Sequence, residues 1–169
     1  MNLWLIGMMG VGKTTVGRAV AERVGARFAD SDDEVVAQVG CSIADYFGTH
    51  GEQAFRDMEQ MAIERLAGLD GQVVATGGGA VLRKANVDVM RRSGTVVWLD
   101  ATAEVLTERI GTNGSRPLLS VAEPTSTTLQ ALSEERNALY LDAAHIVVPA
   151  AESVDEVIER VERLWDASK

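Results

Sequence analysis

The chain has 169 residues, and a chain of this size buries about 68–70% of the surface that its unfolded form exposes, enough for one domain with a substantial core. Hydrophobic residues make up 46% and charged residues 24%, a composition that argues against disorder, collagen and coiled coil. Because 25 acidic residues outnumber 16 Lys and Arg, the net charge is −9. An acidic chain is a poor candidate for sequence-independent nucleic-acid binding, which depends on phosphate attraction. An anionic substrate would therefore need a local cluster of cations.

The cysteine count and the lengths of the apolar runs indicate the cellular compartment of the protein. Cys41 is the only cysteine, so no intrachain disulfide can form, which fits a reducing cytosol. No apolar run approaches the ~20 residues of a membrane span. Residues 1–11 are apolar but have no cationic segment in front, so we expect no signal peptide. We therefore expect a cytoplasmic protein without a membrane partner.

Short apolar runs alternate with longer amphipathic segments along the chain. The apolar runs predict strands at 3–6, 27–29, 73–75, 96–99 and 146–148. Helical spacing predicts helices over 14–24, after Ser42, over 52–66 and after Ser153. Gly25 is a plausible stop for the first helix, and Glu156 stands at capping-box spacing from Ser153. Strands alternating with helices predict an α/β protein whose parallel sheet is covered on both faces.

A glycine-rich motif follows the first predicted strand and opens the first predicted helix. Residues 7–14 read Gly-Met-Met-Gly-Val-Gly-Lys-Thr and fit the P-loop pattern G-x-x-x-x-G-K-[ST]. The glycines let successive backbone N–H groups face phosphates, and the helix N-terminus adds partial positive charge. Lys13 would contact the β- and γ-phosphates, and the hydroxyl of Thr14 would ligate Mg²⁺. The motif predicts nucleotide binding but does not distinguish a kinase from a GTPase or a motor.

Two further candidates stand at predicted strand ends. Asp30 and Asp32 follow the second strand, where one carboxylate could orient Mg²⁺ and the other could take a proton from a substrate hydroxyl. A solvated acidic turn or a helix cap is the alternative. Gly77, Gly78 and Gly79 follow the third strand, and their bare N–H groups would allow close approach of a small ligand. A tight turn is the alternative there.

The arginines and the polar segments complete the set of candidates. Arg56, Arg116 and Arg136 could hold a carboxylate or phosphate, although each taken singly is better explained as a surface ion-pair partner. The segment 111–128 is poor in hydrophobic residues and rich in Gly, Ser and Thr, so it is either a surface loop or a lid. The two histidines have no metal-ligand spacing.

The order of these motifs resembles one kinase family. The P-loop is followed by Asp30-x-Asp32, then by Gly-Glu-x-x-Phe-Arg at 51–56 and Gly-Gly-Gly-Ala at 77–80. Arg-Pro-Leu-Leu at 116–119 and Arg136-x-x-x-Tyr140 come next. The P-loop is shared by many proteins, but this combination and spacing resemble the shikimate kinases from about residue 3 to the last helix.

The resemblance implies a fold and a reaction. The fold would be that of the nucleoside-monophosphate kinases: three layers, a five-stranded parallel sheet, a lid and a substrate-binding subdomain. The whole chain, 1–169, would be one P-loop kinase domain, with a substrate-binding region at about 33–61 and a lid at about 111–126. The reaction would move the γ-phosphate of ATP, with Mg²⁺, to the 3-hydroxyl of shikimate on the chorismate route to aromatic amino acids. We expect a monomer.

The resemblance also assigns roles to residues that match the family's motifs. The catalytic residues would be Lys13, Asp32 and Arg116. ATP would be held by Gly10, Val11, Gly12, Lys13, Thr14, Thr15, Arg109 and Arg116, with Arg109 near the adenine. Shikimate would be held by Asp32, Arg56, Gly77, Gly78, Gly79 and Arg136, with the two arginines on its carboxylate. Mg²⁺ would be held by Thr14 directly and by Asp30 through water. One departure is the segment 149–153, which has no Arg or Lys where family members often carry a basic or polar adenine contact.

Two other functions remain open at the level of sequence. A related small-molecule kinase, such as one acting on gluconate, would share the P-loop. It gives no reason for Arg56, the three glycines and Arg136 to occur together. A non-catalytic nucleotide-binding module is the second alternative, and the presence of Lys13, Thr14, Asp32 and Arg116 argues against it.

Overall fold

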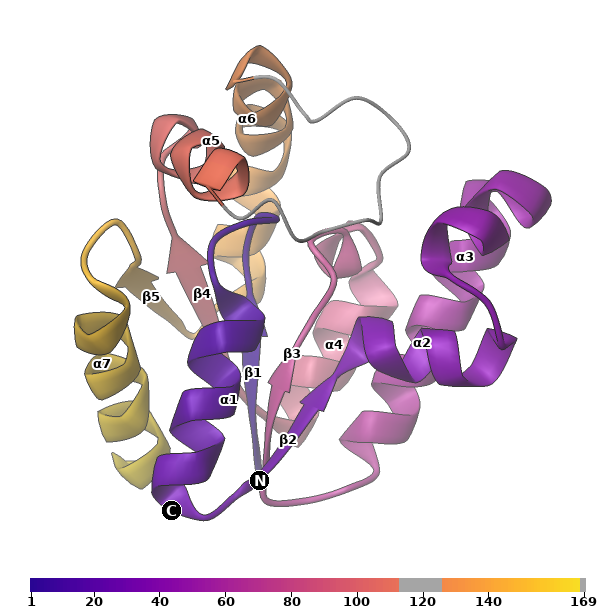
Figure 1. Ribbon diagram of the computed structural model, residues 1–169. Coiled ribbons are helices and arrows are strands. Elements are labelled where there is room, and N and C mark those ends of the chain that lie inside the picture. The colour runs from indigo at the N-terminus through magenta and orange to yellow at the C-terminus, as the bar shows by residue number, and fades with distance from the viewer. Residues whose placement is uncertain (113–125, 168–169) are drawn as a thin grey trace.

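A computed structural model describes residues 1–112 and 126–167 of the chain and shows one parallel sheet flanked by helices (Figure 1). The strands are β1 (Asn2–Ile6), β2 (Arg27–Asp30), β3 (Gln72–Ala75), β4 (Gly94–Asp100) and β5 (Ile146–Pro149). The helices are α1 (Lys13–Val24), α2 (Ser31–Val39), α3 (Ile43–Ala67), α4 (Lys84–Ser93), α5 (Ala103–Thr112), α6 (Ser126–Ala143) and α7 (Val154–Ala167). A short 3₁₀ turn, η1 (Ala80–Leu82), precedes α4.

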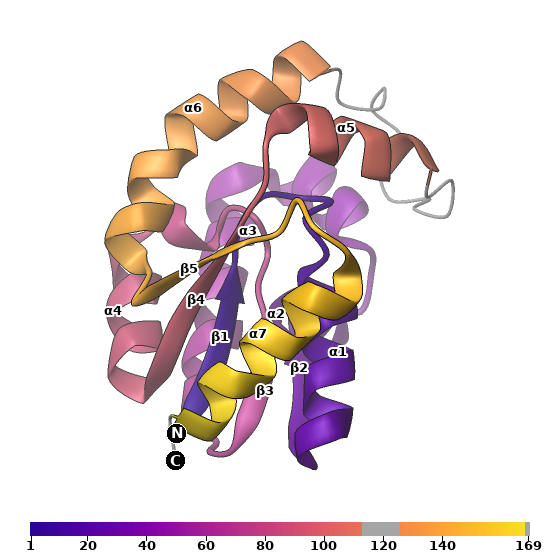
Figure 2. The same ribbon diagram turned by 90° about the vertical axis from the view of Figure 1, so that its left-hand side faces the viewer.

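The sheet has the order β2-β3-β1-β4-β5, and every neighbouring pair is parallel. In β1 and β3 every residue is buried, because helices cover both faces of the central strands. One layer contains α1 and α7, and α4 lies on the opposite side of the sheet with α3 packed against it (Figure 2). The predicted α/β class, three layers and five parallel strands are therefore confirmed.

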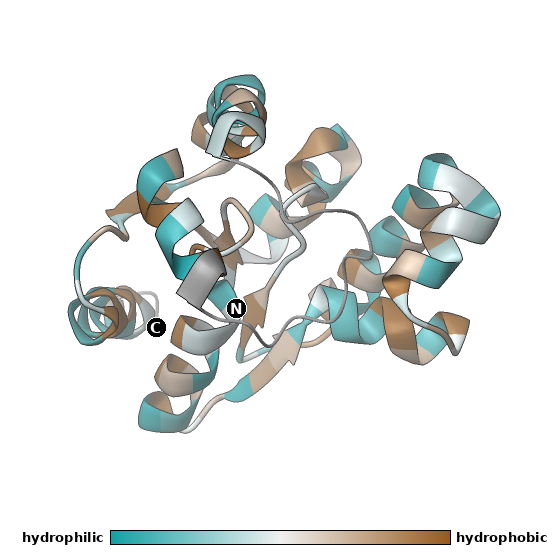
Figure 3. Cartoon of the chain, turned by 45° about the horizontal axis from the view of Figure 1, so that its top comes forward, coloured by the Kyte–Doolittle hydropathy of each residue, from teal (hydrophilic) through white to brown (hydrophobic). Residues whose placement is uncertain are grey.

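Helix α7 illustrates how hydrophobic spacing fixes a helix on the sheet. Its buried residues are Val157, Ile158, Val161 and Trp165, which fall on one face. Figure 3 shows the hydrophobic side of this helix turned toward the rest of the molecule and its hydrophilic side turned outward. None of the described helices combines the length and the hydropathy that a membrane span requires.

Because all strands run the same way, the segments that follow them meet at one edge of the sheet. The P-loop follows β1, Asp30 ends β2, and the three glycines follow β3. Helices α5 and α6 stand above this edge, and α2 with the first part of α3 lies beyond β2 (Figure 1). The fold thus brings the predicted motifs to a common edge.

The predicted ends of helices agree in part with the structure. Gly25 ends α1 with φ 67°, and the side chain of Ser42 caps α3 by accepting the N–H of Asp45. The two helices predicted after Ser42 form one run that is broken at Gly51, where φ is 82° and ψ is 174°. This backbone conformation suits glycine and separates two helical halves.

The sequence does not predict α2, α4, α5 and α6. In α6 the buried residues are only Leu129, Tyr140 and Ala143, so it lacks the apolar stripe that marks a helix packed along its length. The expected loop or lid at 111–128 is too long at both ends, because α5 continues to Thr112 and α6 begins at Ser126. The remainder of that segment lies outside the described residues.

Candidate active site

The P-loop wraps around the side chain of its own lysine. Gly7, Gly10 and Gly12 have φ values of 138°, 78° and 102°, a backbone region that glycine tolerates and other residues rarely adopt. Lys13 is only 8% exposed, and its Nζ donates to the carbonyl oxygens of Gly7 and Met8 at 2.7 and 2.8 Å. The loop therefore holds a positive charge at the N-terminus of α1, which is a favourable place for a phosphate.

A cleft of about 470 Å³ opens beside the P-loop. It is lined by Met9, Gly10, Gly12, Lys13, Thr14, Thr15, Arg18, Asp30, Asp32, Asp33, Val36, Ile43, Thr76, Gly77 and Gly78. The structure thus joins most of the predicted nucleotide, metal and substrate residues in one cavity. Among the described residues, the predicted site residues that do not line it are Val11, Arg56, Gly79, Arg109 and Arg136.

Thr14 and Asp30 form a direct pair across the base of the cleft. The hydroxyl of Thr14 donates to Asp30 Oδ2 at 2.9 Å, while Asp30 Oδ1 accepts the N–H of Asp32 at 3.0 Å and caps α2. The capping and the site interpretations of Asp30 are therefore compatible. Hydroxyl and carboxylate oxygens suit Mg²⁺, which usually takes one or two protein ligands and completes its shell with water and substrate phosphates. The described residues contain no cluster of three or more His, Cys, Asp or Glu that could hold a metal alone.

Gly77 lies against two carboxylates that come from different helices. A Cβ at this position would stand 2.7 Å from Asp32 Oδ1 on α2 and 3.0 Å from Glu59 Oε1 on α3. Only glycine leaves room for both oxygens. Glu59 is a site residue that the sequence analysis missed, and its position three residues after Arg56 on one helix is the signal that could have found it.

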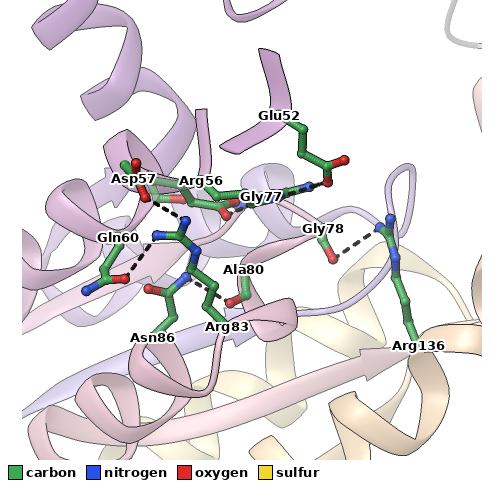
Figure 4. Close-up of polar contacts among 12 residues, drawn as sticks. Glu52, Arg56, Asp57, Gln60, Gly77, Gly78, Ala80, Arg83, Asn86 and Arg136 are labelled. Carbon is green, nitrogen blue, oxygen red and sulfur yellow. Dashed lines mark hydrogen bonds and ion pairs between the residues drawn. The ribbon is translucent and has the colours of Figure 1, made fainter. Parts of the chain in front are cut away.

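Arg56 and Glu59 form a buried ion pair next to the glycines. Arg56 Nη1 lies 2.8 Å from Glu59 Oε2, and the two side chains are 14% and 1% exposed. Burial raises the pKa of the Glu59 carboxyl above its usual value, and the nearby Arg56, Arg83 and Arg136 only partly offset that effect. Arg83 ties the same helix to the start of α4 by donating to Asp57 at 2.6 Å and to Gln60 at 3.1 Å (Figure 4).

The second arginine reaches the glycines from another helix. Arg136 on α6 donates from Nη1 to the carbonyl oxygen of Gly78 at 3.5 Å, and Figure 4 shows Arg56 and Arg136 on opposite sides of Gly77 and Gly78. Gly79 lies directly beneath the guanidinium of Arg56, which a Cβ at that position would strike. The arginines expected to act together therefore do converge on the glycine segment.

Several buried polar atoms around this segment lack a hydrogen bond to the described part of the chain, although Arg56 Nε lies 3.5 Å from Glu52 Oε1 in an ion pair. The buried Arg56 Nε, Arg136 Nε and Glu59 Oε1 have no hydrogen-bond partner among the described residues. A buried polar atom without a partner is costly unless a ligand completes it. Two arginines from different helices, both with donor capacity left, form a receptor for a carboxylate or a phosphate.

Arg109 bridges two segments at the other side of the P-loop. Its guanidinium donates to the carbonyl oxygens of Val11 at 3.2 Å and Glu152 at 3.1 Å. The carboxylate of Glu152 pairs with Arg160 of α7 at 2.6 Å. The segment 149–153, which contains no basic residue, is therefore bordered by arginines from α5 and α7. Arg116 lies outside the described residues.

The sequence of this chain is similar to those of known shikimate kinases. The shikimate kinase family model matches residues 9–165. The shikimate kinase of Symbiobacterium thermophilum is 44% identical over 174 residues, which cover 96% of this chain and 99% of that protein. The shikimate kinase of Neisseria meningitidis serogroup C is 44% identical over 165 residues, with 96% of each chain covered.

The solved structures give the same result. The shikimate kinase of Acinetobacter baumannii, in complex with shikimate, superposes with a TM-score of 0.89 at 34% identity, covering 99% of this chain and 94% of that one. A gluconokinase from Sinorhizobium meliloti superposes with a TM-score of 0.63 at 20% identity, so it shares the fold alone. On the full-length match in sequence and fold, the chain belongs to the shikimate kinase family.

Proposed function

We propose that this chain transfers the γ-phosphate of ATP to the 3-hydroxyl of shikimate, a step in the biosynthesis of aromatic amino acids. The observation that carries the proposal is the convergence of Arg56 and Arg136 on the glycine segment beside the P-loop cleft. The two arginines supply a site for a substrate carboxylate next to the cleft that holds the phosphate site. The Acinetobacter baumannii relative, 34% identical, was solved with shikimate.

The P-loop side of the cleft would hold ATP. The backbone of Gly10, Val11 and Gly12 and the Nζ of Lys13 would hold the phosphates, and Thr15 lines the same wall. Thr14 and Asp30 would hold Mg²⁺, which would neutralise charge on the β- and γ-phosphates. Arg109 would border the adenine, since it already spans the P-loop and the segment before α7.

Asp32 would act as the base for the acceptor hydroxyl. Its carboxylate lies beside Gly77 and lines the same cleft as Lys13. A carboxylate in hydrogen-bond reach of the hydroxyl can take the proton as the new P–O bond forms. Most of the catalysis in such a transfer comes from positioning and from stabilising charge, which the P-loop, Lys13 and Arg116 would supply.

The shikimate molecule would lie beside the glycine segment, between Asp32 on one side and the arginines Arg56 and Arg136 on the other. Arg56 and Arg136 would bind the shikimate carboxylate, and the N–H groups of Gly78 and Gly79 would donate to the acceptor. Glu59 would hold Arg56 in place from behind. Residues 33–61 would form the substrate-binding region, and 111–126 would close over the site as a lid within a single monomeric, cytoplasmic domain.

A coupled assay of ADP release tests the proposal. Purified protein is incubated with Mg-ATP alone and with shikimate, gluconate or AMP. We expect strong stimulation by shikimate only, and mass analysis should show one added phosphate on shikimate. Stimulation of ADP release by gluconate alone would mean that Arg56 and Arg136 bind an acid other than shikimate. ATP binding without stimulation by any acceptor would indicate a binding module.

A further inference from the structure

The segment after β3 is fastened through nearly all of its backbone groups. The N–H of Gly77 donates to Ser31 Oγ at 3.1 Å, and the carbonyl of Gly77 accepts the N–H of Ala80 at 3.1 Å. The carbonyl of Gly79 accepts the N–H of Leu82 at 3.0 Å. The carbonyl of Ala80 accepts Asn86 Nδ2, also at 3.0 Å.

Two adjacent backbone N–H groups of this segment are left without a hydrogen bond to any described residue. Within the described part of the chain, no acceptor is found for the N–H groups of Gly78 and Gly79. A segment tied down by its carbonyls and leaving adjacent N–H groups open is organised to donate to a ligand. The Gly79 N–H belongs to the peptide bond between Gly78 and Gly79, so the orientation of this peptide determines the direction of the Gly79 N–H.

One side chain outside the predicted site fixes that peptide. The hydroxyl of Tyr140 on α6 donates to the carbonyl oxygen of Gly78 at 2.6 Å. The Tyr140 ring is 1% exposed and is stacked on Trp98 of β4 with ring centres 5.7 Å apart. The same hydroxyl lies 3.7 Å from Met8 Sδ in the P-loop. Tyr140 thus joins α6, the P-loop and the glycine segment.

Peptide geometry turns this contact into an effect on the donor. In a planar trans peptide the C=O and the following N–H point in opposite directions. Figure 4 shows the Gly78 carbonyl directed toward Arg136 on α6, with Arg56 on the other side. Holding that carbonyl toward α6 therefore turns the N–H of Gly79 toward α3, where Gly79 lies against the Arg56 guanidinium.

We propose that Tyr140 is a positioning residue for the acceptor: its hydroxyl orients the Gly78–Gly79 peptide so that the Gly79 N–H joins Arg56 in binding the acid. The inference rests on the proposed function for the identity of the acid, but the orientation itself is a property of the free protein. Burial raises the pKa of Tyr140 to about 12, so the phenol stays a donor throughout the working range of pH. Tyr140 does not touch the reacting atoms.

The test uses Tyr140→Phe, which removes the hydroxyl and keeps the ring that stacks on Trp98. The matched control is Ser93→Ala, which removes another hydrogen bond to a buried aromatic side chain, the 3.1 Å bond from Trp4 Nε1. Ser93 ends α4, at the opposite edge of the sheet from the cleft. Both variants should lower the melting temperature by a few degrees, so stability alone does not separate them.

The first readout is the glycine amide spectrum of the free, ¹⁵N-glycine-labelled proteins. Tyr140→Phe should move the Gly79 amide resonance more than that of glycines remote from Tyr140, such as Gly25 or Gly40, and Ser93→Ala should leave it in place. An unmoved Gly79 resonance in Tyr140→Phe would overturn the inference. If Tyr140→Phe does not fold, a titration of the wild-type protein with shikimate still tests whether the Gly79 N–H takes part in binding. Shikimate should shift the amides of Gly78 and Gly79 but not that of Gly77, and an unshifted Gly79 amide would refute the role.

The second readout is affinity. By calorimetry, Tyr140→Phe should weaken shikimate binding by about threefold to tenfold, the effect of one lost hydrogen bond, with the ATP Kd unchanged. Ser93→Ala should keep both constants. Equal loss of shikimate affinity in the two variants would mean a general structural effect and would overturn the inference. A wild-type protein that binds no shikimate would refute the proposed function, and the free-protein spectrum would still decide the role of Tyr140.

Discussion

The guanidinium of Arg56 is held 2.8 Å from the carboxylate of Glu59, a side chain that is itself only 1% exposed. The pair comes from one turn of α3 and lies against Gly77 and Gly79. Removing one member of a buried ion pair leaves the other uncompensated, so the pair fixes the direction of Arg56 as well as its charge. The geometry makes Glu59 a support for Arg56, the side chain that we propose binds the acid.

Glu59→Gln is expected to raise the KM for shikimate about tenfold, because a hydrogen bond to a charged group contributes about 1.5–3 kcal/mol. The kcat and the KM for ATP should change little, since Glu59 does not line the P-loop cleft. Steady-state kinetics with both substrates measure this. Glu52→Gln is the matched control, because Glu52 is 61% exposed and lies 3.5 Å from Arg56. An equal effect in the two variants would contradict the assignment.

The same substitution should change how stability depends on pH. Burial raises the pKa of Glu59 in the folded protein above its ordinary value of 4.5. The folded state therefore holds this proton more tightly than the unfolded state, and the wild type loses stability as pH rises from 4.5 through the folded pKa. Glutamine does not ionise, so the free energy of unfolding of Glu59→Gln minus that of the wild type should increase across this window. Urea denaturation at several pH values tests it, and parallel curves would refute it.

Gly79→Ala is expected to weaken shikimate binding about tenfold with little loss of stability. The backbone at Gly79 has φ −93°, which alanine adopts, but its Cβ would strike the guanidinium of Arg56. That group is the end of a flexible side chain, so it would move aside and leave the acid without its partner. Calorimetric titration with shikimate and thermal unfolding measure the two effects.

Gly78→Ala provides the comparison within the same segment. The nearest atom to a Cβ at Gly78 is the Met9 nitrogen at 3.5 Å, which is ordinary van der Waals contact. We therefore expect Gly78→Ala to weaken shikimate binding less than Gly79→Ala. A reversed order of the two Kd values would show that the close approach of Arg56 is not the cause.

Local sequence signals predicted the half of the site that follows strands. The P-loop, Asp30, Asp32 and the three glycines each lie at or just after the end of a β-strand, and parallel strands end at one edge. These motifs depend on neighbours along the chain, so a single sequence is enough to place them.

The other half depends on long-range packing. Arg136 and Tyr140 come from α6, whose few buried residues give no clear periodic stripe, so its position over the glycines could not be derived from spacing. The convergence of Arg136 with Arg56 was expected only from the resemblance to a family, and no role was predicted for Tyr140. Glu59 and Ser31 were missed because a carboxylate on a helix and a serine in a turn are ordinary surface residues until the fold buries them.

Asp32→Asn is expected to lower kcat by about 10²–10⁴, the usual contribution of a general base. ATP binding should be retained, because Thr14 and Lys13 remain in place. Pre-steady-state ADP formation and ATP titration separate the two effects. Asp33→Asn is the matched control, since Asp33 is an exposed neighbour with a 3.8 Å ion pair to Arg18. A loss in kcat that is equal in both variants would remove Asp32 from the role of base.

His145 provides a prediction remote from the cleft. The N–H of Val96 in β4 donates to His145 Nδ1 at 3.0 Å, and the N–H of His145 donates to the carbonyl of Val96 at 2.8 Å. The first bond requires an unprotonated Nδ1. Burial, helped by the charge of Arg91, lowers the pKa of His145 below 6.5. The side-chain bond to β4 forms only while the ring is neutral, whereas the backbone bond does not depend on the charge of the ring.

The sign of the pH effect follows from this depressed pKa. Below pH 6.5 the imidazole of His145 binds a proton more readily in the unfolded chain than in the folded one. The free energy of unfolding therefore falls as the pH drops from 6.5 through the folded pKa. For one proton, this loss is at most about 1.4 kcal/mol per pH unit. In His145→Asn, the side-chain oxygen can accept from Val96 without titrating, so the curve between pH 7.5 and 5 should be flatter. Equal slopes for His145→Asn and the wild type in urea denaturation would show that the Val96–His145 contact does not control this acid sensitivity.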